Sequence, residues 1–227
     1  MKHELHEQFM IKILLDIYRN KFLSQNLYFK GGTAFYLFYD LSRFSTDLDF
    51  DISTNCKNKE ELFKELKNIL AKYGEIKDAR IKMNTVFFVL SYEKGERLIK
   101  IEASKRDFPQ KHEIKNIFGV DIKLLNLDLL CAHKLVALTE RIKARDLFDT
   151  YFIFLNKFPI NKEIIKIRTD KDFKEFLIYL KNKINKNFTR KNILQELGEV
   201  IEDNKKIWIK DHLENEVVKM IDKLIIK

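Results

Sequence analysis

The chain has 227 residues and a mass of 27.3 kDa, which suits one domain or one domain with a smaller appendage. Hydrophobic residues make up 45% and aromatic residues 12% of the chain, which excludes a disordered protein. The formal net charge of +9 favours a polyanionic partner such as nucleic acid, although an AT-rich genome would produce the same excess of lysine.

The cysteines and the hydropathy pattern bear on the compartment. Cys56 and Cys131 have no Cys or His neighbours at metal-ligand spacing and do not resemble a disulfide framework, which indicates a reducing compartment. The first residues are charged and polar, unlike a signal peptide. No apolar stretch approaches the roughly 18 residues that span a membrane. We therefore expect a cytoplasmic protein without a membrane partner.

Hydrophobic periodicity predicts an α+β fold. In the first part, the pattern predicts a helix over 4–23, an extended run at 27–29, a buried helix over 33–42, a strand over 47–52 and a helix over 58–73. The next expected elements are strands over 76–82, 85–93, 97–104 and 118–124, with a polar loop over 105–116. From residue 127 onward the pattern is helical, with a break at Pro159.

The expected fold is a mixed or antiparallel sheet with flanking helices, followed by a helical region. The pattern changes from mixed α/β to all-α near residue 155. We therefore predict one domain over 1–155 and a helical C-terminal domain over 156–227.

Two acids dominate the predicted strand over 47–52, where acidic and apolar residues alternate. Because strand side chains alternate between faces, Asp47 and Asp49 project from the same face, roughly 6–7 Å apart at the backbone. Leu48 and Phe50 anchor the opposite face in the core. Hard carboxylate oxygens are the ligands that Mg²⁺ prefers, and phosphoryl transfer uses such ions. The pair therefore predicts a catalytic metal site, whereas either acid alone would indicate a solvated strand.

Gly31 and Gly32 precede the buried helix that the pattern starts at Thr33. Glycine permits backbone conformations closed to other residues and a close approach to phosphate. The first turn of a helix directs unpaired N–H groups toward an anion. We expect Gly31, Gly32 and Thr33 to cradle a triphosphate, with a hydrogen bond from the Thr33 hydroxyl.

Glu102 is the candidate for a third carboxylate. In the predicted strand over 97–104 it lies on the polar face, opposite Ile101 and Ala103, on the second arm of a hairpin that turns at 94–96. A third metal ligand or general base belongs on such a neighbouring strand. By itself, the residue would be an ordinary surface glutamate.

The segment KGGTAFYLFYDLSRFSTDLDF resembles the first motif of the AbiEii/AbiGii toxin family of nucleotidyltransferases, within the DNA polymerase β-like superfamily. The matched positions are Gly31, Gly32, Thr33, Arg43, Ser45, Asp47 and Asp49. The segment KIEAS, which contains Glu102, resembles the second motif. The resemblance implies a polymerase β-like fold and a toxin from a toxin–antitoxin or abortive-infection system. It covers about residues 28–150, and the chain is short for the family.

A basic helix face follows. Lys134, Arg141 and Arg145 share one face if the helix is continuous. These cations either bind a triphosphate or form an ordinary solvated basic face. The segments around Lys134, Arg141 and Arg145-Asp146 also resemble the family's third and fourth motifs, which favours nucleotide binding. Asp146 then orients a neighbouring group, and Arg43 and Ser45 contact phosphate or hold the loop before Asp47.

These features predict an enzyme that uses two Mg²⁺ ions to transfer a nucleoside monophosphate from an NTP to an acceptor, with release of pyrophosphate. The resemblance and the charge favour RNA, first of all tRNA, as the acceptor and imply a cognate antitoxin partner. Residues 181–191 carry several cations and Phe188, so they are a candidate RNA contact or a solvated turn. The alternatives are a non-catalytic RNA- or protein-binding module, similar to an antitoxin, and a transferase that modifies a protein or a small molecule.

Overall fold

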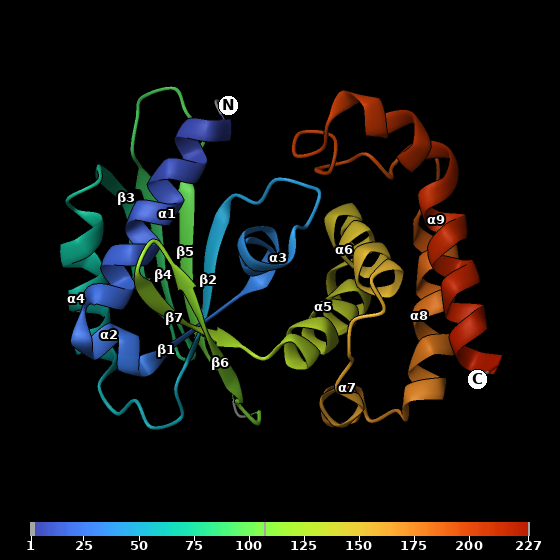
Figure 1. The fold of residues 1–227 in the computed structure, drawn as a ribbon, viewed down its shortest axis with the longest axis horizontal. Coiled ribbons are helices and arrows are strands. Elements are labelled where there is room, and N and C mark those ends of the chain that lie inside the picture. The colour runs from blue at the N-terminus through green and yellow to red at the C-terminus, as the bar shows by residue number, and fades with distance from the viewer. Residues whose placement is uncertain (1–2, 107, 227) are drawn as a thin grey trace. The chain divides into compact units, whose positions relative to one another are not determined.

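The structure is a computed structural model that describes residues 3–106 and 108–226. Its contacts divide the chain into two compact units. The first unit comprises the residues up to Asp40 together with Phe44–Leu125, and the second comprises Leu41–Arg43 together with the residues from Asn126 onward. Figure 1 labels the elements of each unit.

The first unit is built on a mixed seven-stranded sheet. Its strands, in the order in which they lie side by side, are β3 (Glu75–Ile81), β4 (Thr85–Ser91), β5 (Ile99–Lys105), β2 (Asp47–Ile52), β1 (Leu27–Lys30), β7 (Val120–Leu125) and β6 (His112–Ile117). The central strand β2 pairs with β1 in antiparallel and with β5 in parallel orientation. The hairpin predicted between β4 and β5 is confirmed by their antiparallel pairing.

Helices cover this sheet because their apolar stripes bury against it. The helices of the first unit are α1 (His3–Arg19), α2 (Lys21–Asn26), α3 (Gly31–Tyr39) and α4 (Lys59–Leu70). Helices α1, α2 and α4 contact one another and the sheet, while α3 packs on β1 and β2. Figure 1 shows α3 on the other side of the sheet from α1 and α4. The mixed sheet and its flanking helices confirm the predicted fold class.

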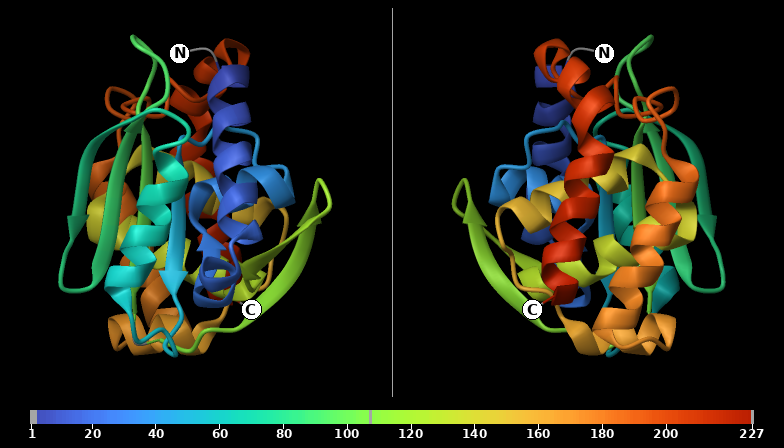
Figure 2. Two further views of the ribbon diagram at one scale, coloured as in Figure 1. Left: turned by 90° about the vertical axis from the view of Figure 1, so that its left-hand side faces the viewer. Right: turned by 90° about the vertical axis from the view of Figure 1, so that its right-hand side faces the viewer.

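Two predicted elements of the first unit were wrong. The single helix expected over 4–23 is two helices, because the side chain of Asn20 accepts hydrogen bonds from the backbone N–H groups of Phe22 and Leu23 and starts a new helix there. The polar loop expected over 105–116 contains β6, which forms an edge hairpin with β7 (Figure 2). Along β6 exposed and half-buried residues alternate, so the strand has no apolar face that a sequence pattern would reveal.

The second unit is helical, as predicted from residue 127 onward. Its helices are α5 (Leu127–Arg141), α6 (Ala144–Leu155), α7 (Lys162–Thr169), α8 (Phe173–Asn187) and α9 (Asp203–Ile226). Residues 189–200 form a series of turns instead of a helix. These turns are held by buried apolar side chains that include Ile193, Leu197 and Val200.

The two units divide at residue 125, whereas the sequence pattern placed a domain boundary at 155. The difference arises because α5 and α6 pack on one another and on α7, α8 and α9, so their apolar faces belong to the helical unit. Among the helices of the described residues, none is long and apolar enough to cross a membrane.

Candidate active site

The acidic face of β2 is held in place by the apolar side chains on its other face. Leu48 and Phe50 are fully buried, and the Phe50 ring packs 5.4 Å from that of Phe29 on β1. Asp47 and Asp49 point the opposite way and are each half-buried. Because side chains alternate along a strand, a strand with only one face in the core has one apolar face and, here, one acidic face.

Strand β5 places Glu102 next to this pair. In the parallel register of β2 and β5, Asp49 lies opposite Glu102 and Asp47 lies opposite Lys100. Glu102 is half-buried, and the Ser104 hydroxyl donates a hydrogen bond of 2.9 Å to its Oε1 atom. The structure therefore brings the three predicted carboxylates onto adjacent strands of one sheet.

The three carboxylates do not converge on one point. Among the described residues, no three His, Cys, Asp or Glu side chains lie close enough together to hold a metal ion between them. Mg²⁺, however, is usually held by one or two carboxylates together with water and substrate phosphates. Half-buried, neighbouring Asp47 and Asp49 fit that open donor set, with Glu102 beside them.

Gly31 is packed directly against this acidic face. Its φ angle is +85°, and it opens α3, which begins two residues before the predicted start at Thr33. A Cβ atom at Gly31 would collide with the Oδ2 atom of Asp49. Position 31 therefore needs glycine for two reasons: the left-handed backbone and the space that the Asp49 carboxylate occupies.

Thr33 and Ser45 join α3 to the start of β2. Thr33 is fully buried, with its Oγ1 atom 2.9 Å from Ser45 Oγ and hydrogen-bonded to the Asp47 carbonyl. A hydroxyl carries one proton, so Thr33 donates to the carbonyl and accepts from Ser45. In this arrangement the buried Thr33 hydroxyl connects the first turn of α3 to the backbone of Asp47.

Lys30 supplies a positive charge that sequence reasoning missed. It lies opposite Asp49 in the register of β1 and β2, and its Nζ atom pairs with the carboxylate of Asp51. Asp51 is itself buried. Burial lowers the pKa of Lys30, against the opposing attraction of Asp51. The alternation of β2 was the available sequence signal for this ion pair, because it places Asp51 on the same face as Asp47 and Asp49, where a cation would compensate the acids.

The second unit holds the other predicted residues in a chain of ion pairs. Arg43 donates two hydrogen bonds to Asp149, from Nε to Oδ1 at 2.6 Å and from Nη2 to Oδ2 at 2.7 Å. Lys134 Nζ lies 2.6 Å from Asp149 Oδ2 and 3.4 Å from Asp146 Oδ1. Arg141 closes the chain with bonds of 2.7 and 2.8 Å to Asp146. We call these five residues the ion-pair network.

Most of this network is buried, and its cations keep its two aspartates ionised. Asp146 and Asp149 are each 1% exposed and Lys134 is 8% exposed. Burial alone would raise the pKa of Asp149, but Arg43 and Lys134 outweigh it and hold that pKa at about 2. Burial likewise opposes Lys134 and Arg141 at Asp146, and the two cations keep the pKa of Asp146 below its usual value. Both aspartates are therefore ionised at neutral pH.

The condition for one shared basic face, a continuous helix from Lys134 to Arg145, is not met. Helix α5 ends at Arg141, and Ile142 adopts a left-handed conformation with φ of +44°, after which α6 begins at Ala144. Arg145 therefore lies on a different helix from Lys134, and its Nη2 atom is 3.6 Å from Glu196. Within the network, the Arg141 side chain is the most exposed part, at 56%.

Asp149 was not among the predicted site residues, although it ends the segment that resembles the family's fourth motif. It bridges Arg43 and Lys134, whose positions in the sequence give no indication that they meet. The available signal was its spacing from Asp146, because acids at i and i+3 of a helix lie on one face. An apolar helix with two such acids predicts that cations from elsewhere bury against it.

Comparisons with known proteins show the family of the chain and its fold. The family model described as "Nucleotidyl transferase AbiEii toxin, Type IV TA system" matches residues 12–217. No sequence among the curated proteins matches the chain.

Three solved structures share the fold. JHP933 from Helicobacter pylori has 22% sequence identity and a TM-score of 0.64, with 99% of this chain and 92% of that chain covered. A second Helicobacter pylori structure has 22% identity and a TM-score of 0.58, with 98% and 97% covered. MenT4, a nucleotidyltransferase toxin from Mycobacterium tuberculosis, has 16% identity and a TM-score of 0.53, with 97% and 88% covered.

Proposed function

Because this chain belongs to the AbiEii family of nucleotidyltransferase toxins, we propose that it transfers a nucleoside monophosphate from an NTP to RNA. The first candidate acceptor is tRNA. An acceptor hydroxyl loses its proton and attacks the α-phosphorus, the bond from the α-phosphorus to the bridging oxygen breaks, and pyrophosphate leaves. A toxin that modifies tRNA in this way acts in the cytoplasm, where NTPs and tRNA are present.

The observation that carries the proposal is the acidic pair of β2 beside Glu102 in the parallel register with β5. Asp47 and Asp49 would hold Mg²⁺, which supplies positive charge to the phosphate oxygens when it is bound. Glu102 accepts the proton of the attacking hydroxyl, since its carboxylate is half-exposed beside the pair and oriented by Ser104. Lys30 balances part of the negative charge on this face through Asp51.

The first turn of α3 supports the assignment of a phosphate site. Gly31 and Gly32 open this helix, and the backbone N–H groups of its first turn have no partner within the helix. These groups and the helix dipole favour an anion close to Asp49, where phosphate and metal charge would compensate one another. Ser45 and Arg43 act as positioning residues. Ser45 orients Thr33 through a hydrogen bond, and Arg43 orients Asp149 through an ion pair.

Lys134, Arg141, Arg145 and Asp146 remain predicted nucleotide-binding residues on the strength of their motifs. Within the second unit, Arg141 is the member of the ion-pair network best able to reach a ligand, because more than half of its side chain is exposed. Lys134 forms ion pairs with Asp146 and Asp149, so its main role is to position these two aspartates.

An RNA acceptor is supported by the net charge of +9 and by the cations of residues 181–191. The family's description as part of a type IV toxin–antitoxin system supports a cognate antitoxin as a partner.

The proposal is tested by incubating the purified protein with Mg²⁺, total tRNA and each α-labelled NTP in turn. The matched variants are Asp49→Asn and Asp40→Asn, since Asp40 is an exposed acid whose left-handed backbone suits asparagine. Label on tRNA with the unmutated protein and with Asp40→Asn, but not with Asp49→Asn, is the expected result. Label that appears only on protein or on a small molecule would overturn the RNA acceptor, and transfer without added Mg²⁺ in the presence of a chelator would overturn the metal assignment.

A further inference from the structure

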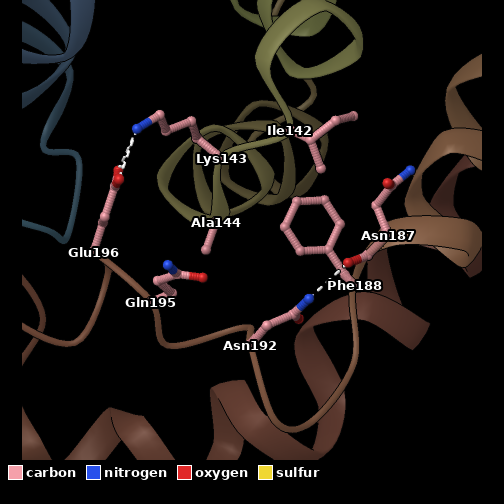
Figure 3. Close-up of a pocket in the computed structure, with 8 residues that line it drawn as sticks. All are labelled: Ile142, Lys143, Ala144, Asn187, Phe188, Asn192, Gln195 and Glu196. Atoms are coloured by element: carbon pink, nitrogen blue, oxygen red, sulfur yellow. Dashed lines mark hydrogen bonds and ion pairs between the residues drawn. The ribbon is translucent and has the colours of Figure 1, made fainter.

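A pocket of about 210 Å³ lies wholly within the second unit. Three stretches of chain form it: the link between α5 and α6, the end of α8, and the turns that follow α8 (Figure 3). Its volume is below the roughly 300–1,000 Å³ of sites that enclose a whole small-molecule ligand. The pocket is therefore suited to a part of a larger ligand.

Carboxamide groups with unused hydrogen-bonding capacity line this pocket. The side chain of Gln195 forms no hydrogen bond with the part of the chain that the structure describes. Asn187 donates from Nδ2 to the Lys183 carbonyl at 2.7 Å, and within the described residues its Oδ1 atom receives no hydrogen bond. A free amide offers donors and an acceptor side by side, which matches the edge of a nucleobase.

The remaining lining fits the face of a base. The apolar part of the lining is the half-buried Ile142, backed by the buried side chains of Ala144 and Phe188 (Figure 3). Asn192 stabilises the lining, because its Nδ2 atom donates to the Asn187 carbonyl at 2.7 Å and its Oδ1 atom accepts from the Thr189 backbone at 2.8 Å. An apolar surface beside free amides recognises a flat group with polar edges.

The charge around the pocket suits a nucleic acid backbone. Lys186 and Lys191 are exposed and flank Asn187 and Phe188 in the sequence, and residues 181–191 contain no acid. The one acid in the lining, Glu196, is neutralised by Lys143 at 2.6 Å and faces Arg145 at 3.6 Å. The hydrogen bond from Lys143 lowers the pKa of Glu196, so this ion pair persists at neutral pH.

We propose that this pocket binds one unpaired nucleobase of the RNA acceptor, with the neighbouring phosphates held by the exposed lysines. The inference rests on the proposed RNA acceptor and adds a binding site in the second unit. The pocket is smaller than the sites that enclose a whole small-molecule ligand such as an NTP, and the run of cations beside it favours a nucleic acid strand over a protein segment.

The test measures binding by fluorescence anisotropy without NTP or Mg²⁺. The probe is a labelled single-stranded RNA of about ten nucleotides, a length within the site sizes typical of single-strand binders. A second probe has the same backbone without bases. The variants of the full chain are Gln195→Leu, which removes only the free amide, and Asn182→Leu, which makes the same kind of change at an exposed position of α8 within the basic run.

We expect Gln195→Leu to weaken binding of the intact RNA about tenfold, the effect of one lost hydrogen bond to a base, and to leave binding of the abasic probe unchanged. Asn182→Leu should bind both probes as the unmutated protein does. Equal binding of the two probes by the unmutated protein would overturn the proposal, and so would unchanged binding by Gln195→Leu, which would assign the pocket to another ligand such as a protein segment. The readout is independent of catalysis, so a protein that binds the base but transfers no label would contradict the proposed function alone.

Discussion

Carboxylates perform opposite tasks in the two units. Those of the first unit, Asp47, Asp49 and Glu102, are half-buried and lie on neighbouring strands of the sheet. Those of the second unit, Asp146 and Asp149, are buried, and each is bound by two cations. A buried carboxylate bound by two cations stabilises the protein, whereas half-buried acids grouped on one face of a sheet are suited to binding a cation from solution.

The largest effect is expected from removing a compensated carboxylate. Asp149→Ala leaves Arg43 and Lys134 buried without their shared partner. We expect the free energy of unfolding to fall by about 3–5 kcal/mol, as in other proteins that lose one member of a buried ion pair. Urea unfolding followed by the fluorescence of Trp208, the only tryptophan and a residue of α9, measures the change.

Asp211→Ala is the control for that change. Asp211 pairs with Arg190 at 2.8 Å in the same unit, but the Arg190 side chain is 75% exposed. The free energy of unfolding should then change by less than about 1 kcal/mol. Equal losses in the two variants would contradict a structural role for the buried network.

Glu102→Gln removes charge from the acidic face instead. The side chain is half-exposed, so its conversion to an amide should leave the free energy of unfolding nearly unchanged. Nucleotide transfer should fall by about 100-fold, the low end of the effect of a general base. Label transfer measures the loss, and Glu93→Gln, an exposed glutamate, serves as the control. Full activity of Glu102→Gln would remove this residue from the catalytic set.

Acid should affect the two units in different pH ranges. Burial lowers the pKa of His6 below 6.5 in the folded protein, where its Nε2 atom is 3.0 Å from the Thr46 carbonyl. Unfolding lets His6 take up a proton, so the first unit loses stability as the pH falls below 6.5. Asp149 has its usual pKa of 3.8 lowered to about 2, so its contribution of about 2 kcal/mol is complete above pH 3.8 and is lost as the pH falls toward 2.

The buried cysteines distinguish these ranges, since Cys56 belongs to the first unit and Cys131 to the second. Labelling by a disulfide reagent that reacts in acid, followed by mass spectrometry, should modify Cys56 at a higher pH than Cys131. The variant His6→Gln should shift the labelling of Cys56 toward lower pH and leave Cys131 unaffected. Labelling of both thiols at one pH in every variant would mean that the units unfold together.

The smallest expected effect on transfer activity is at Gly31, which is packed against Asp49. Gly31→Ala introduces strain at a φ of +85° and a methyl group that displaces the Asp49 carboxylate, while Gly95→Ala introduces the same strain at a φ of +87° with no atom within 4 Å. Both variants should lose about 1 kcal/mol in the free energy of unfolding. Only Gly31→Ala should also lose transfer activity, by about tenfold or more. Equal activity of the two variants would show that the contact with Asp49 is dispensable.

Local patterns predicted the elements that carry the first unit's candidates. The alternation of acids and apolar residues predicted β2 over 47–52 with the bounds that the structure shows, and the alternation around Glu102 placed it on the adjacent polar face. Period-two patterns are informative here because one face of the sheet is buried. They failed for β6, an edge strand without a buried face.

Long-range electrostatics were beyond the reach of these patterns. Nothing local to Arg43 indicates a partner 106 residues away, and nothing local to Lys134 indicates that its charge is compensated by Asp149. The helix that would have carried one basic face is interrupted at Ile142, which has a left-handed backbone although it is not a glycine. The pairing of distant charges therefore had to come from the structure.

The short excursion of Leu41–Arg43 into the second unit ties the two modules together along the chain. A gene fragment that ended at Leu125 would encode Arg43 without Asp149, and a fragment that began at Asn126 would encode Asp149 and Lys134 without Arg43. Either half expressed alone would therefore lack one partner of the Arg43–Asp149 ion pair. During translation, Arg43 likewise leaves the ribosome long before Asp149 exists, so the helical module can complete its interior only after most of the polypeptide has been made.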